Sequence, residues 1–272
     1  MSVVYTWKQV LGREVPEKAD YDAVLNEVRV ACSVEGAIIA ALALGSVVRG
    51  DYTPHRSDLD VLVVYHEGKE SRAVKCLNAL VVLAQERYVA LKLIPCDHLI
   101  AESRLHFFGP SFMKHLAHSA SIGGVLKGDV IEQFAPSVTA NEEIESYLRH
   151  KLYRLESIHA RSAALKEDDK TRFLEKLLEA PIHVARKMLT YCGTPADPDT
   201  KREVAQCYED VMPTQLGEEL CELVALDAGY SEELERQLVE PDEDRYRQHL
   251  DMIHLNAGRI ITFVRHNILH LM

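Results

Sequence analysis

Two short apolar runs joined by a polar connection constrain the fold of this chain more than any other feature of its sequence. The first run, Ala37–Leu44, is continuous and is bounded by Gly36 and Gly45, and the second is Leu59–Tyr65. Continuous apolar runs of this length are typical of strands buried on both faces, although a buried helical segment gives the same pattern. We therefore expect a buried strand, a turn with a polar connection, and a second buried strand.

Two aspartates lead the second run. Side chains alternate between the faces of a strand, so Asp58 and Asp60 share one face while Leu59 points to the other. Their carboxylates then lie within roughly 6–7 Å of each other, and two like charges held so close require a compensating cation. Magnesium binds carboxylate oxygens together with substrate phosphates, and two such ions could hold both the attacking and the leaving oxygen. Asp58 and Asp60 are thus candidate ligands of two Mg²⁺ ions.

The turn after the first run has the chemistry of a phosphate site. Gly45 can adopt dihedrals closed to other residues and lets a phosphate approach the main chain. If a helix begins after Ser46, its N–H groups and the serine hydroxyl form an anion site, and Arg49 adds a charged donor. Taken singly, a Gly-Ser pair is an ordinary turn, and an Asp-x-Asp pair also occurs at solvated strand ends and in calcium loops. Their combination carries the interpretation.

The spacing of these residues resembles that of the nucleotidyltransferases of the DNA polymerase beta superfamily, and most closely the small bacterial "minimal" nucleotidyltransferases. The shared pattern is Gly-Ser, two residues, Arg-Gly, and then Ser-Asp-x-Asp, here Gly45, Ser46, Arg49, Gly50, Ser57, Asp58 and Asp60. The resemblance implies an α/β (α+β) domain with a mixed sheet. It also implies that the Gly-Ser turn holds the terminal phosphates and that the aspartates hold the metal ions that bridge triphosphate and acceptor hydroxyl.

The chain lacks an acid at the position where this family has a third carboxylate. Relatives place an acid on a following strand, where it binds metal or accepts the proton of the acceptor hydroxyl. We expect that strand at residues 88–95, after a helix over residues 71–87, and it contains no acid: Ala90 stands where many relatives have aspartate, with Lys92 two residues on. Asp97 or Glu86 could substitute, the enzyme could manage with two acids, or the domain could bind nucleotide without turnover.

From Asn141 onward the apolar residues recur at helical spacing. We expect helices over residues 141–160, 171–191, 201–211 and 216–228 and from Pro241 to the C-terminus, with Pro181 kinking or splitting the second. We therefore expect a nucleotidyltransferase domain over residues 1–138 and an all-α helical bundle domain over residues 139–272. This order resembles nucleotidyltransferases joined to a helical, substrate-binding domain of the HEPN type, although a bundle that only covers the sheet is the alternative.

The composition of the 272-residue chain excludes several functional classes. Six scattered cysteines without a C-x-x-C pair predict neither a disulfide framework nor a zinc site, and indicate reduced thiols in a cytoplasmic protein. We expect no membrane partner, because no apolar run approaches the roughly 20 residues of a membrane span. The formal net charge of −11 argues against extended nucleic acid as a partner. The sequence does not distinguish a monomer from a homodimer.

We therefore expect a metal-dependent nucleotidyltransferase that moves a nucleoside monophosphate from a nucleoside triphosphate to a hydroxyl of a small molecule or protein. We expect that monophosphate to be AMP. An antibiotic-modifying adenylyltransferase and a toxin–antitoxin component are two versions that the motif does not separate. The alternative from another class is a nucleotide-binding regulatory protein without turnover. The missing third acid favours this alternative.

Overall fold

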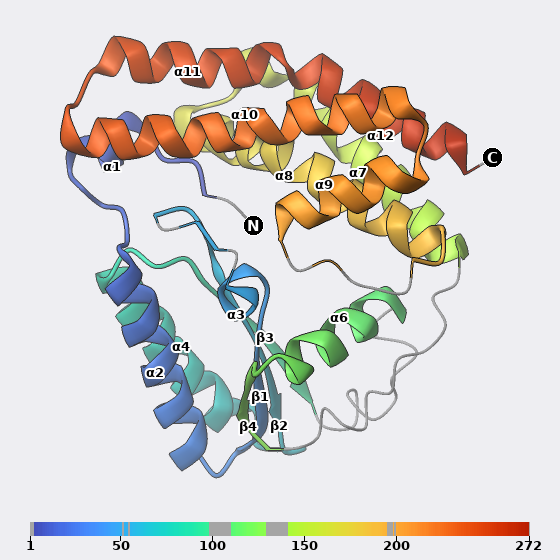
Figure 1. The fold of residues 1–272 in the computed structure, drawn as a ribbon. Coiled ribbons are helices and arrows are strands. Elements are labelled where there is room, and N and C mark those ends of the chain that lie inside the picture. Colours follow the sequence, from blue (N-terminus) through green and yellow to red (C-terminus); the bar gives the residue numbers. More distant parts are fainter. Residues whose placement is uncertain are drawn as a thin grey trace. The chain divides into compact units, whose positions relative to one another are not determined.

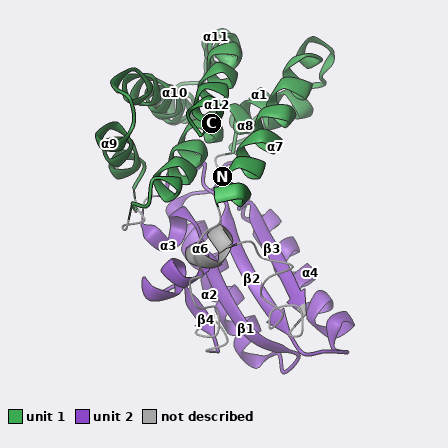
Figure 2. Cartoon of the chain, turned by 90° about the vertical axis from the view of Figure 1, so that its right-hand side faces the viewer, with its two compact units in different colours: residues 1–14, 140–272 green, residues 15–139 purple. Residues whose placement is uncertain are grey.

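The computed structural model describes residues 3–50, 52–53, 55–97, 110–128, 141–194, 198 and 200–271. The chain divides into two compact units (Figure 2). Residues 15–139 form one, which we call the sheet unit, and residues 1–14 with 140–272 form the other, the helical unit. The first fourteen residues thus belong with the C-terminal half, an arrangement that the sequence patterns did not indicate.

The sheet unit is built on four strands in the order β3-β2-β1-β4 (Figure 1). The strands are β1 (Ile38–Leu44), β2 (Leu59–Tyr65), β3 (Leu91–Asp97) and β4 (Val125–Lys127). β1 pairs antiparallel with both β2 and β4, whereas β2 and β3 are parallel. The predicted fold class, a mixed-sheet α/β domain followed by a helical region, is confirmed.

Helices cover both faces of this sheet, so the central strands β1 and β2 are largely buried on both sides. Helices α2 (Lys18–Val34) and α4 (Glu70–Glu86) pack on one face, against a cluster that includes Leu59, Val61 and Val63. The other face packs against α6 (Pro110–Ser121), and alternate residues of the same strands form that core. This two-sided burial explains why both runs are continuously apolar instead of alternating.

In the helical unit, two helices are longer than the sequence patterns predicted, and the segment from Pro241 forms two helices instead of one. The helices of this unit are α1 (Trp7–Leu11), α7 (Asn141–His159), α8 (Glu167–Tyr191), α9 (Lys201–Val211), α10 (Thr214–Val239), α11 (Glu243–Leu255) and α12 (Ala257–His270), with a 3₁₀ turn at Ser162–Ala164. Pro181 does not split α8, which stays continuous although proline removes a helical hydrogen bond. Extensive burial of its apolar side chains offsets that loss.

Two buried tyrosines attach the N-terminal segment to the helical unit. The Tyr5 N–H donates to Tyr230 Oη at 3.0 Å, and Tyr246 Oη donates to the Tyr5 carbonyl at 2.9 Å. The two hydroxyls also lie within 2.8 Å of each other, so they form one network with the Tyr5 backbone.

None of the helices in the described residues is long and apolar enough to cross a membrane.

Candidate nucleotide site

The motif residues gather where β1 ends and where β2 and β3 begin. Antiparallel pairing places Leu44, the last residue of β1, beside Asp60, and parallel pairing places Asp60 beside Lys92 of β3. Asp60 belongs to the alternate set of β2 residues, together with Leu62 and Val64, whose apolar members pack on the α6 side. The site therefore lies on that side of the sheet, beyond the end of the apolar core.

Gly45 leaves β1 in a conformation that other residues rarely adopt. Its dihedrals are φ 81° and ψ −157°, and it caps α3 (Ser46–Arg49), a single helical turn that ends at Gly50. A Cβ atom built on Gly45 would lie 3.6 Å from Oδ2 of Asp60. The glycine backbone therefore faces the Asp60 carboxylate with no side chain between them, which leaves room for a ligand to approach both.

Ser57 ties the polar connection to α2 and α3. Its Oγ accepts from the Thr53 N–H at 2.9 Å and from Ser46 Oγ at 3.3 Å, and its carbonyl accepts from Tyr21 Oη at 2.7 Å. Burial raises the pKa of Tyr21 well above its usual value, and the charge of Asp58 acts in the same direction. Tyr21 therefore keeps its proton and remains a donor that fixes the residue before Asp58.

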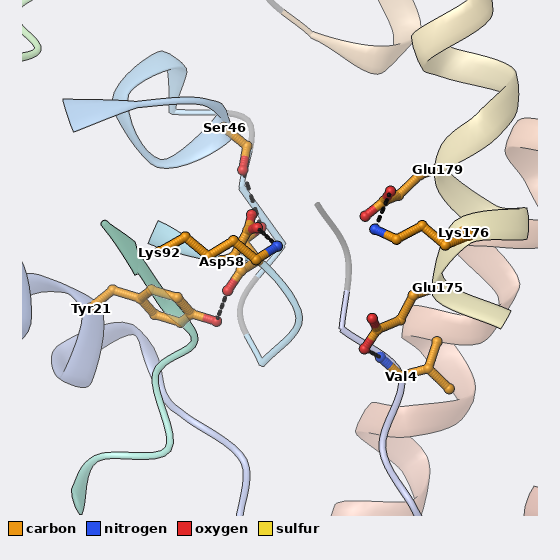
Figure 3. Close-up of polar contacts among 9 residues, drawn as sticks. Val4, Tyr21, Ser46, Asp58, Lys92, Glu175, Lys176 and Glu179 are labelled. Carbon is orange, nitrogen blue, oxygen red and sulfur yellow. Dashed lines mark hydrogen bonds and ion pairs between the residues drawn. The ribbon is translucent and has the colours of Figure 1, made fainter. Parts of the chain in front are cut away.

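Asp58 forms an ion pair with Lys92 across the sheet. The Lys92 Nζ lies 2.5 Å from Oδ2 of Asp58, and Figure 3 shows the ammonium directed at that carboxylate. The Asp58 side chain is 1% exposed, whereas that of Lys92 is 38% exposed. Removing a carboxylate from water is costly unless it is paired and hydrogen-bonded, so Lys92 compensates a charge that this chain buries.

The strand register places Asp97, one of the two predicted substitutes for the third carboxylate, far from Asp60. Ala90 lies beside the start of β2, because its carbonyl accepts from the Leu59 N–H at 3.0 Å. Asp97 pairs with Tyr65 at the opposite end of the strand, five residues beyond Lys92 and therefore roughly 16 Å away along β3. Glu86 ends α4 and is exposed. Among the residues that the structure describes, no three histidine, cysteine or acidic side chains gather as a metal site.

Two arginines border the site. Arg49, the predicted phosphate donor, is the last residue of α3 and is partly buried. Arg56 is fully buried just before Ser57, and neither its burial nor a role was predicted from the sequence.

The acidic pair fits a magnesium ion whose remaining ligands come from a triphosphate. Magnesium is commonly held by one or two carboxylates together with phosphates, and it does not need an all-protein cage. Asp60 faces the open backbone of Gly45, and Asp58 precedes it by two residues. The unexpected member of the site is Lys92. Strand alternation places Lys92 on the same face as Ala90, but its contact with Asp58 depends on the register between β2 and β3.

The comparisons with known proteins agree with this geometry. Residues 25–110 match the family model described as a nucleotidyltransferase domain. The matched segment includes β1, β2 and β3, and with them Gly45, Asp58 and Asp60. A search of curated proteins found no matching relative. Residues 25–110 therefore carry a nucleotidyltransferase domain, and the match supports the nucleotidyltransferase superfamily and a transferase activity.

Proposed function

We propose that this protein is a magnesium-dependent nucleotidyltransferase that transfers a nucleoside monophosphate from a nucleoside triphosphate to a hydroxyl group. The monophosphate that we propose is AMP. The observation that carries the proposal is the approach of the Gly45 backbone to the Asp60 carboxylate, at 3.6 Å from the position of a Cβ atom. One surface then offers a phosphate-accessible backbone and a metal-binding acid to the same ligand. The nucleotidyltransferase domain match over residues 25–110 supports the reaction class.

Each residue of the site has a separate task in this proposal. Gly45 and the N–H groups that follow it receive the terminal phosphates, the Ser46 hydroxyl adds a donor, and Arg49 supplies a positive charge. Asp58 and Asp60 hold the metal, which when bound neutralises the triphosphate and the leaving pyrophosphate. Ser57 and Tyr21 hold Asp58 in place through the hydrogen bonds described above. Nucleotidyl transfer depends mainly on such positioning and charge neutralisation.

For the acceptor, we propose only its chemical class. A hydroxyl on a small molecule or on a protein suits an acidic chain of net charge −11 better than a long nucleic acid does. We assign acceptor binding to the helical unit, by analogy with HEPN-like and other helical partners of nucleotidyltransferases. An antibiotic-modifying enzyme and a toxin–antitoxin component both satisfy this description.

The test is pyrophosphate release from ATP and Mg²⁺ across a panel of hydroxyl acceptors. We expect Asp60→Asn to lower the rate at least a hundredfold, because the amide loses the negative charge that binds metal. Glu67→Gln is the matched control, since Glu67 is exposed and follows β2 at its opposite end. Equal rates for wild type and Asp60→Asn would refute the assignment of Asp60.

A nucleotide-binding regulatory protein without turnover is the second candidate, and one observation favours it. Ala90 stands where relatives place the third acid and Lys92 pairs with Asp60, so no carboxylate in the described part of β3 is beside Asp60 to accept a proton. Calorimetry with ATP and Mg²⁺ separates the two candidates. Binding without pyrophosphate release for any acceptor supports the regulatory protein, and binding with release supports the enzyme.

A further inference from the structure

We propose that the ammonium of Lys92 takes the place of a second divalent cation beside Asp58, so that the acidic pair binds one Mg²⁺ ion instead of the two expected from the sequence. The inference rests on the proposed function, because it concerns the metal of the same site. It assigns Lys92 a role as a positioning residue that sets the metal count.

The geometry of the ion pair carries the inference. The Lys92 Nζ lies 2.5 Å from Oδ2 of Asp58, and the Asp58 side chain is 1% exposed. One oxygen of this buried carboxylate therefore already has a cation against it. A metal ion on the same oxygen must either displace the ammonium or lie next to a positive charge of the protein.

The two aspartates differ in the environment that would receive a metal. Asp60 is partly exposed and faces the Gly45 backbone, where a triphosphate can supply further oxygen ligands. Asp58 is buried, and its backbone is held next to Ser57, which Tyr21 fixes by a 2.7 Å hydrogen bond. We therefore assign the single ion to Asp60, with Asp58 contributing its second oxygen.

The register explains how Lys92, two residues beyond the position of the relatives' acid, reaches Asp58. Lys92 pairs with Asp60 on the neighbouring parallel strand, so its side chain leaves the sheet on the same side as Asp60. Its long stem then spans the distance to Asp58. The ammonium at this position balances the Asp58 carboxylate, which leaves the single negative charge of Asp60 for one divalent ion.

The probe is Mn²⁺, counted on the full-length protein without nucleotide from the loss of the electron paramagnetic resonance signal of the free ion. We expect one Mn²⁺ per chain in wild type and one in Lys92→Arg, which keeps the charge. In Lys92→Met, which keeps the stem without the charge, we expect at least tenfold tighter binding. Lys92→Asp, which adds a carboxylate, should bind two ions.

Lys75→Met is the matched control, because Lys75 is exposed on α4 and should leave the count and the affinity unchanged. A count other than one in wild type, or a folded Lys92→Met with wild-type affinity, would overturn the proposal. Circular dichroism checks the fold, and if Lys92→Met does not fold, the counts for wild type and Lys92→Arg decide. One ion without pyrophosphate release refutes only the proposed enzyme, whereas two ions with release refute only the one-ion inference.

Discussion

The two glycines that flank α3 provide a matched pair of substitutions that separates backbone strain from ligand access. Gly45 has φ 81° and ψ −157°, a region that is essentially restricted to glycine, so Gly45→Ala should destabilise the sheet unit by about 1–3 kcal/mol. Gly50 has φ 75° and ψ 7°, the left-handed helical region, where an alanine costs about 1–2 kcal/mol. The two variants should therefore lose comparable free energies of unfolding.

Their effects on nucleotide binding should differ. The new methyl group at position 45 would lie 3.6 Å from Oδ2 of Asp60, an ordinary contact, so it fits the protein but fills the space that a phosphate needs. A Cβ at Gly50 would meet no atom within 4 Å. We expect Gly45→Ala to weaken ATP binding at least tenfold, which corresponds to about 1.4 kcal/mol, and Gly50→Ala to retain wild-type affinity.

Urea unfolding measures the first quantity and calorimetry with ATP and Mg²⁺ measures the second, at a temperature at which both variants are folded. The reasoning fails if Gly45→Ala binds ATP within twofold of wild type. It also fails if Gly50→Ala loses as much affinity, because binding would then follow stability and not access to the Asp60 carboxylate.

Two further predictions concern contacts described above, and a third concerns Cys32, a buried thiol of α2 in the core of the sheet unit. Tyr246→Phe removes the donor to the Tyr5 carbonyl and should lower the free energy of unfolding of the helical unit by about 1–2 kcal/mol, with faster proteolysis of the N-terminal segment as a second readout. Ser57→Ala removes the acceptor of the Thr53 N–H and should lower both stability, by about 1–3 kcal/mol, and ATP affinity, whereas unchanged affinity would contradict its positioning role. Burial raises the pKa of Cys32 from 9.0 to about 11, so the unfolded thiol ionises at lower pH than the folded one. Stability should therefore fall between pH 9 and 11 more steeply in wild type than in Cys32→Ala, and parallel unfolding profiles would refute this.

The sheet could be predicted from the sequence because its strands are buried on both faces. Helices α2 and α4 on one side and α6 on the other bury every residue of β1 and β2 except Ile39 and Asp60, which leaves the continuous runs visible in the sequence. Asp60 interrupts the apolar pattern of β2 only where the core ends, and Asp58 precedes the strand. The two-residue period of a strand predicts a shared face for Asp58 and Asp60, and this prediction required no tertiary information.

The contacts that depend on register and chain topology could not be predicted in the same way. Lys92 reaches Asp58 only because β2 and β3 pair in parallel with Asp60 beside Lys92, and single-strand patterns do not contain that register. The buried Arg56 likewise has no apolar periodicity to reveal it. In the helical unit, Pro181 predicted an interruption that the burial of α8 overrides.

The membership of residues 1–14 in the helical unit has a consequence for synthesis on the ribosome. The helical unit is discontinuous, because the whole of residues 15–139 separates its first segment from its remainder. Tyr5 is synthesised before the sheet unit, but Tyr230 and Tyr246, which bind its backbone, are synthesised after it. The sheet unit can therefore fold before the residues that bind the N-terminal segment have been synthesised. A fragment that begins at residue 140 would lack Tyr5 and with it the backbone groups that these two hydroxyls bind.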